Sequence, residues 1–131
     1  MLTICTWFWG DKYSLDDVAK LAAGVRRHLK QPYRFACIHD KGFPALSDDV
    51  HCSWPIPDEH LIKVDGCFAR LRMFDPIWQK AYPMHPMYGE PASDRIVCID
   101  LDAVITGQLD DIFNRHEHFV ILQGANSSNP C

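Results

Sequence analysis

Two carboxylates separated by one residue form the most chemically informative pattern in this 131-residue chain. Asp100 and Asp102 follow the apolar run Ile96–Ile99, which predicts a buried β-strand. Ligands of open α/β sheets bind beyond the carboxyl ends of the strands. Carboxylate oxygens at that place suit a hard divalent cation such as Mn²⁺ or Mg²⁺, which is usually shared with substrate phosphates. The segment therefore predicts a metal site.

The apolar run before Asp100 also predicts that this carboxylate is partly desolvated. An unpaired charge in such a place is costly, and a metal ion or a basic side chain would relieve that cost. The alternative interpretation is purely structural, with Asp100 capping a turn and Asp102 in solvent.

The elements that must position these carboxylates begin with two apolar strands around one amphipathic helix. Met1–Trp9 is almost wholly apolar, which is typical of a strand buried on both faces. Ser14 and Asp17 resemble a capping box before a helix that we predict over Leu15–Lys30. Tyr33–His39 is a second apolar run. Strand, helix and strand in this order predict an α/β fold with a parallel sheet.

The rest of the chain predicts shorter elements, separated by turn-rich stretches. In chain order we expect a short strand at Val50–Ser53, a loop over Ser53–Lys63, a helix over Gly66–Phe74, a second helix starting at Pro76, a long loop over Tyr82–Asp94, a clear strand at Arg95–Leu101, a helical turn at Leu109–Phe113 and a last strand at Phe119–Leu122.

Composition excludes several functional classes. The formal net charge is -4, and the scattered Lys and Arg residues form no basic stripe for nucleic acid. No apolar run is long enough to span a membrane, and the first residues lack the features of a signal peptide. The six cysteines form no CxxC pair, so we expect buried free thiols in a reducing, cytoplasmic compartment and no zinc site.

Two enzyme classes share the local pattern around Asp100. The segment IDLDAVI is similar to the nucleophile motif of haloacid-dehalogenase-like phosphatases, in which Asp100 would be the nucleophile and Asp102 the acid/base. That motif normally opens its domain and needs a later Lys, whereas no Lys follows Asp102 in this sequence. Sugar-nucleotide transferases with a GT-A fold instead hold Mn²⁺ on a D-x-D that follows their nucleotide-binding strands. This second layout is the one in this chain.

The chain resembles the family 8 glycosyltransferases and their GT-A relatives. The matching features are a helix with an aromatic residue, a basic residue and Leu, then a strand that ends in D-x-D, then an acidic-apolar turn. Here they are Phe68-Ala69-Arg70-Leu71, IVCIDLD and LDDIF. The resemblance implies a Rossmann-like, mostly parallel sheet flanked by helices, with residues 1–131 as one nucleotide-sugar-binding domain, and we expect that domain to be incomplete.

The resemblance also assigns roles to particular residues. It implies that Arg70 contacts the sugar-nucleotide, since Arg can bind diphosphate oxygens bidentately. It implies a metal ion, Mn²⁺ or Mg²⁺, on Asp100 and Asp102. The complete set implied for nucleotide-sugar binding is Thr6, Trp7, Tyr13, Arg70, Asp100, Leu101 and Asp102.

Other polar residues near these positions receive structural interpretations. Phe8-Trp9-Gly10 stands where the family usually shows Asp or Asn, which leaves the identity of the base open. Asp40 is interpreted as a turn residue. The family's third metal ligand is commonly a His further downstream, and we interpret His116 and His118 as loop residues rather than ligands.

The expected reaction is transfer of a hexose from a nucleoside-diphosphate sugar, preferentially a UDP-sugar, to an unidentified acceptor. The alternatives are the phosphatase and a non-catalytic nucleotide-binding fragment. The polar segment Gln123–Cys131 directly follows the last expected strand, so we expect the chain to be a fragment of a larger domain. Since the family's third metal ligand and acceptor-side residues lie further downstream, we expect weak metal binding and little turnover from this chain alone. An uncovered sheet edge could pair two copies as a homodimer.

Overall fold

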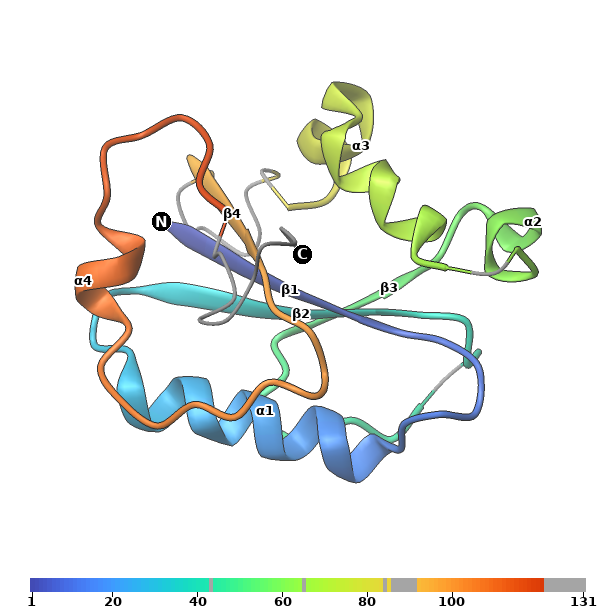
Figure 1. Cartoon of the computed structure of the whole chain (residues 1–131), viewed down its shortest axis with the longest axis horizontal. Coiled ribbons are helices and arrows are strands. Elements are labelled where there is room, and N and C mark those ends of the chain that lie inside the picture. Colours follow the sequence, from blue (N-terminus) through green and yellow to red (C-terminus); the bar gives the residue numbers. More distant parts are fainter. Residues whose placement is uncertain (43, 65, 84, 86–91, 122–131) are drawn as a thin grey trace, which may run out of the picture.

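The chain folds into a Rossmann-like α/β domain with a four-stranded, all-parallel sheet. The computed structural model describes residues 1–42, 44–64, 66–83, 85 and 92–121. The strand order is β3-β2-β1-β4, and helices cover both faces of the sheet (Figure 1). The strands are β1 (Leu2–Phe8), β2 (Tyr33–His39), β3 (Cys52–Pro55) and β4 (Arg95–Cys98). The helices are α1 (Leu15–His28), α2 (Glu59–Ile62), the 3-10 helix η1 (Phe68–Phe74), α3 (Pro76–Ala81) and α4 (Asp110–Phe113).

Strand β1 lies inside the sheet and is buried along its whole length. Its neighbours are β2, in register from Leu2 opposite Tyr33 to Phe8 opposite His39, and β4 on the other side. The apolar runs therefore predicted both central strands correctly, and the bounds of β2 are those expected from the sequence.

Helix α1 covers one face of the sheet. Its inward side chains include Val18, Leu21 and Val25, which pack on β1 and β2 residues. The Asp17 carboxylate accepts hydrogen bonds from the Ser14 backbone N–H (2.8 Å) and the Ser14 hydroxyl (3.0 Å). The predicted helix start is thus confirmed, while the helix ends at His28, two residues before the predicted Lys30.

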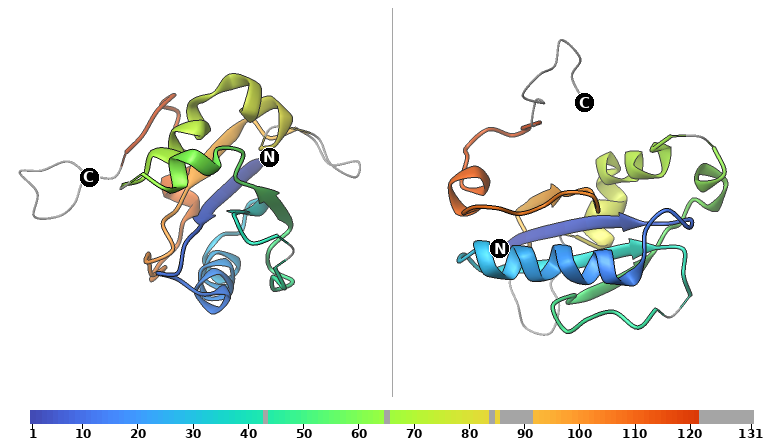
Figure 2. Two further views of the ribbon diagram at one scale, coloured as in Figure 1. Left: turned by 90° about the vertical axis from the view of Figure 1, so that its right-hand side faces the viewer. Right: turned by 60° about the horizontal axis from the view of Figure 1, so that its bottom comes forward.

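Helices α2, η1 and α3 cover the opposite face of the sheet (Figure 2). Aromatic rings fill the core on that face. Trp7 stacks on Trp78 with ring centroids 5.8 Å apart. Trp54 meets Trp78 edge-on at 6.3 Å and Tyr82 at 5.8 Å. Such pairs add specific geometry to the burial of large apolar surfaces.

The segment between residues 50 and 63 is more ordered than the sequence predicted. The third strand is Cys52–Pro55 rather than Val50–Ser53, and Glu59–Ile62 forms α2 where a loop was predicted. The shift follows from packing, because Cys52 and Trp54 turn inward while Ser53 and Pro55 face solvent. The two prolines in the predicted loop are Pro55 and Pro57. They lie where strand pairing ends or where no backbone N–H donor is needed.

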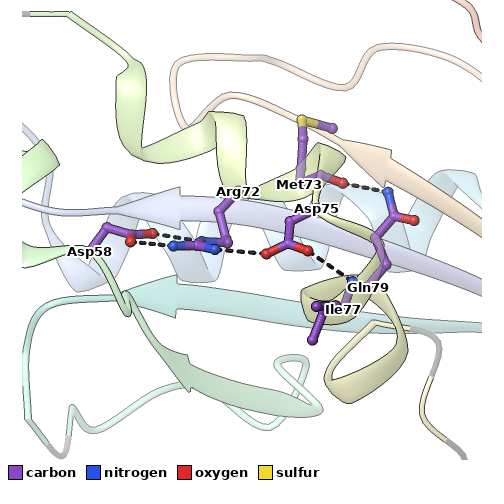
Figure 3. A network of polar contacts seen from close by, with 6 residues as sticks. All are labelled: Asp58, Arg72, Met73, Asp75, Ile77 and Gln79. Atoms are coloured by element: carbon purple, nitrogen blue, oxygen red, sulfur yellow. Dashed lines mark hydrogen bonds and ion pairs between the residues drawn. The ribbon is translucent and has the colours of Figure 1, made fainter.

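A network of charges joins α2, η1 and α3 (Figure 3). Arg72 donates to Asp58 through Nε (2.7 Å) and to Asp75 through Nη1 (2.7 Å). Asp75 in turn accepts the Ile77 backbone N–H (2.8 Å) at the start of α3. Hydrogen bonds from Arg72 lower the pKa of both carboxyl groups, so both stay ionised at neutral pH. The network therefore fixes η1 relative to its neighbours.

Strand β4 is the edge of the described sheet. Its four residues are only half buried, so the prediction of a fully buried strand at this position was wrong. The strand also ends at Cys98 instead of Leu101. Of the expected strand at Phe119–Leu122, residues 119–121 are exposed and lie outside any strand, and Leu122 lies outside the described residues, as do 84 and 86–91 of the expected long loop.

Free thiols line both cores. Cys5, Cys37 and Cys52 are buried, Cys98 is half buried and Cys67 is exposed. Burial raises the pKa of Cys37 to about 12 and that of Cys98 to about 11, and it also raises the pKa of Cys5. Among the helices in the described part of the chain, none has the length and apolar character needed to cross a bilayer.

The buried thiols predict a simple pattern of chemical reactivity. In a Cys131→Ser variant at pH 8, a thiol-specific chromogenic reagent should react rapidly with one thiol, Cys67. The remaining thiols should react at least about 1000-fold more slowly, since little thiolate forms at a raised pKa and burial blocks access. Adding Cys67→Ser should abolish the fast phase, and a second rapid thiol would contradict the described packing of the sheet.

Asp110 connects α4 to the end of α1. Its carboxylate accepts the backbone N–H groups of Lys30 (3.1 Å) and Gln31 (3.0 Å). We expect Asp110→Ala to lower the free energy of unfolding by about 1 kcal/mol, as for loss of a helix-capping side chain. Asp111→Ala is the matched control, because Asp111 is the exposed neighbour in the same helical turn. Equal urea denaturation midpoints for the two variants would contradict this role.

Candidate functional site

The strand order identifies one place in the sheet where a ligand is expected. The chain adds β2 and β3 on one side of β1 and then places β4 on the other side. In doubly wound sheets, ligands bind at this reversal, outside the carboxyl ends of the two strands that flank it. Here those strands are β1 and β4, so the candidate site lies beyond Phe8 and Cys98.

The D-x-D segment follows β4 at this place. Leu101 is buried, with 7% of its surface exposed, and packs in the core on the α1 side. Asp100 and Asp102 flank it and face solvent, and 52% of the Asp100 side chain is exposed. The predicted desolvation of Asp100 was therefore wrong, because β4 is an edge strand that ends two residues earlier. Leu101 fixes the backbone, and both carboxylates are exposed.

Arg70 lies against the first carboxylate of the pair. Its guanidinium forms an ion pair with Asp100 through Nη1 and Oδ1. The same guanidinium lies 5.7 Å from the centroid of the Trp9 ring, in a cation-π arrangement. The side chain comes from η1, where the preceding Ala69 is buried against the aromatic core. The structure thus joins two segments that the sequence linked only by resemblance.

Tyr13 contacts the second carboxylate. Its hydroxyl donates to Asp102 Oδ2 at 3.1 Å, and the Lys12 ammonium lies 4.9 Å from the centroid of the Tyr13 ring. Gly10, with a φ of 66°, turns the chain out of β1 toward this point. Three separate segments, at residues 9–13, 70 and 100–102, therefore meet at the reversal of the sheet.

Thr6 and Trp7, the strand residues singled out from the sequence, lie in the interior. Thr6 is fully buried, and Trp7 is 4% exposed and stacked on Trp78. Trp9, just after β1, is instead the aromatic residue beside the charged residues, and it is absent from the set predicted from the sequence. Trp9 lies just past the end of β1, as Asp100 does after β4. Because ligands bind beyond the carboxyl ends of the strands, the same reasoning applied to β1 would have identified Trp9.

A shallow groove of about 330 Å³ adjoins Asp102 and runs between α1 and the segment 101–105. The close approach of the two depends on Gly24, since a Cβ there would lie 3.2 Å from Ile105 Cγ1. Lys20 and Arg27 contribute cationic side chains to the groove wall. The space beside Asp102 is therefore open, and its wall combines charged and apolar side chains.

Two carboxylates are the oxygen ligands that this site offers. Within the described residues, no group of three or more His, Cys, Asp or Glu side chains is arranged to hold a metal ion. A pair suits a cation that completes its coordination with water and substrate phosphates, as Mg²⁺ commonly does. His116 and His118 are exposed residues after α4.

Asp40 has the turn role predicted for it. Its carboxylate accepts the Gly10 backbone N–H at 3.3 Å and pairs with Lys41 at 3.4 Å. These contacts join the turns that follow β1 and β2.

A histidine and a serine also meet at the ends of β2 and β3. His39 Nε2 lies 2.7 Å from Ser53 Oγ, and His39 Nδ1 accepts the Lys41 backbone N–H at 3.2 Å. With Nδ1 as acceptor, a neutral ring carries its proton on Nε2 and donates it to the serine. Burial lowers the pKa of His39, so the neutral ring dominates at pH 7. The pair therefore lacks a base directed at the hydroxyl and does not form a nucleophile.

Comparison of the chain with protein-family models, curated proteins and solved structures finds no match. The architecture established is an α/β domain with a four-stranded parallel sheet, and the chemistry of the site must be argued from its own residues.

Proposed function

We propose that this chain forms the nucleotide-sugar-binding part of a metal-dependent glycosyltransferase of the GT-A type. One observation carries the proposal: Arg70, Asp100, Asp102 and Tyr13 converge at the carboxyl-end reversal of the sheet. Paired carboxylates beside an arginine are suited to a cation and a diphosphate bound together. The resemblance to family 8 enzymes supports a hexose as the transferred group and a UDP-sugar as donor.

Asp100 and Asp102 would hold the cation, Mn²⁺ or Mg²⁺. Both are exposed, and their backbone is anchored by the buried Leu101. When bound, the cation would neutralise charge that grows on the departing diphosphate. Tyr13 orients the Asp102 carboxylate through its hydroxyl, which is the role that outer partners of metal ligands commonly play.

Arg70 would add positive charge on the diphosphate oxygens. A guanidinium presents parallel N–H donors that match such oxygens bidentately. Trp9 holds it beside the site by contact with its ring face, so the charge is positioned before the leaving group develops its own. Preorganised charge of this kind is a large contribution to catalysis of group transfer.

The proposed site predicts nucleotide binding that depends on a cation. Calorimetric titration should detect UDP binding that requires Mn²⁺, and the Asp100→Ala/Asp102→Ala double variant should lose it by at least about 100-fold, as expected for removal of both cation ligands. Asp48→Ala/Asp111→Ala is the matched control, since it removes two exposed carboxylates elsewhere.

The control variant should bind UDP as the unmodified chain does. Absence of Mn²⁺-dependent binding by the folded chain would contradict the proposal. Mg²⁺-dependent hydrolysis of a generic phosphoester, abolished by Asp100→Asn, would support the phosphatase instead.

The contribution of the Tyr13 hydroxyl to binding can be tested by itself. Tyr13→Phe keeps the ring and removes the donor to Asp102, so Mn²⁺-dependent UDP binding should weaken roughly 3- to 10-fold, toward the lower end of known effects of such partners. Tyr33→Phe is the control, because Tyr33 begins β2 at the amino end of the sheet. A loss of the same size in both variants would indicate a general structural effect and exclude a specific role for Tyr13.

A further inference from the structure

One of the two carboxylates proposed as cation ligands already has a cationic partner. Asp100 Oδ1 is paired with Arg70 Nη1, whereas the described contact of Asp102 is with the neutral Tyr13 hydroxyl. A divalent cation that enters alone must therefore displace a positive charge from Asp100 or bind beside it. The repulsion between the cation and the Arg70 guanidinium is moderate at an exposed site. It nevertheless acts over a few ångströms and disfavours binding of the cation.

Arg70 is held where it makes this pair. Trp9 faces its guanidinium, and Ala69 anchors the helix beneath it. Two residues later, Arg72 binds Asp58 and Asp75 and fixes η1 relative to α2 and α3 (Figure 3). The backbone from which Arg70 extends is therefore fixed, and the contact with Trp9 favours the position of the guanidinium beside Asp100.

The guanidinium also has an unused donor. Arg70 Nε is buried, and within the described residues no atom accepts a hydrogen bond from it. Leaving a buried donor unpaired is costly, and an oxygen-rich anion at the site would remove that cost. The arrangement thus favours an incoming group that brings acceptor oxygens over one that brings only positive charge.

We propose that Arg70 is an internal counter-ion that makes cation binding at Asp100 and Asp102 depend on the diphosphate. Asp100 exchanges Arg70 for the cation only when diphosphate oxygens arrive to accept the guanidinium. Cation and diphosphate then bind with positive coupling, and by linkage each raises the affinity for the other by the same factor. This inference rests on the proposed function and specifies how the same site is controlled.

The test measures binding of each partner separately. MnCl₂ alone is titrated into the unmodified chain and into Arg70→Gln, and UDP is titrated with and without saturating Mn²⁺. Arg70→Gln should bind Mn²⁺ alone roughly tenfold more tightly, and UDP in the presence of Mn²⁺ roughly tenfold more weakly, within the usual range of coupling between sites. Arg115→Gln is the matched control, because Arg115 pairs only with Glu117 among the described residues and carries the same charge.

Arg115→Gln should behave as the unmodified chain in both titrations. Equal Mn²⁺ affinity in all three proteins, with Mn²⁺-dependent UDP binding intact, overturns the inference and leaves the proposed function standing. No Mn²⁺ binding by any folded protein, whether UDP is present or absent, overturns both. If Arg70→Gln fails to fold by circular dichroism, Arg70→Met provides the neutral variant, since its long apolar side chain can still cover Trp9 and Ala69, and the same outcomes apply.

Discussion

Burial of β1 on both faces is the constraint on which the remaining structure depends. Seven consecutive residues of this strand are removed from solvent, so one covering layer is not enough. Helix α1 covers one face, and the aromatic residues beneath η1 and α3 cover the other. Because apolar burial is the dominant favourable term in folding, both layers are needed to stabilise the strand between them. The ends of β1 are then held in fixed positions relative to both layers.

The candidate site exists because these two layers bring different residues to one end of β1. Tyr13 comes from the connection to α1, and Arg70 comes from η1 on the opposite layer. Between them, β4 ends in the D-x-D segment. The edge position of β4 leaves Asp100 and Asp102 exposed, while Leu101 remains in the core.

Each carboxylate of the D-x-D segment has a different partner. Arg70 and Tyr13 each take one carboxylate, and the Asp58–Arg72–Asp75 network holds the helix from which Arg70 extends. The contacts of this network are structural. Under the proposed reaction the network also matters for function, because it positions the helix that carries Arg70. Two arginines only two residues apart have distinct roles, because a 3-10 helix directs them to different neighbours.

Local patterns in the sequence were sufficient for β1, β2, α1 and the residues of the D-x-D segment. Apolar runs, helical spacing and the Ser14–Asp17 cap act over a few residues and are written directly in the chain. Strand order, the short β3 and α2, and the edge position of β4 depend on pairing between distant segments, which local periodicity does not encode. The same holds for Trp7 and Trp9: both are aromatic, and only the packing of Trp78 against β1 decides that Trp7 is core while Trp9 lies beside Arg70.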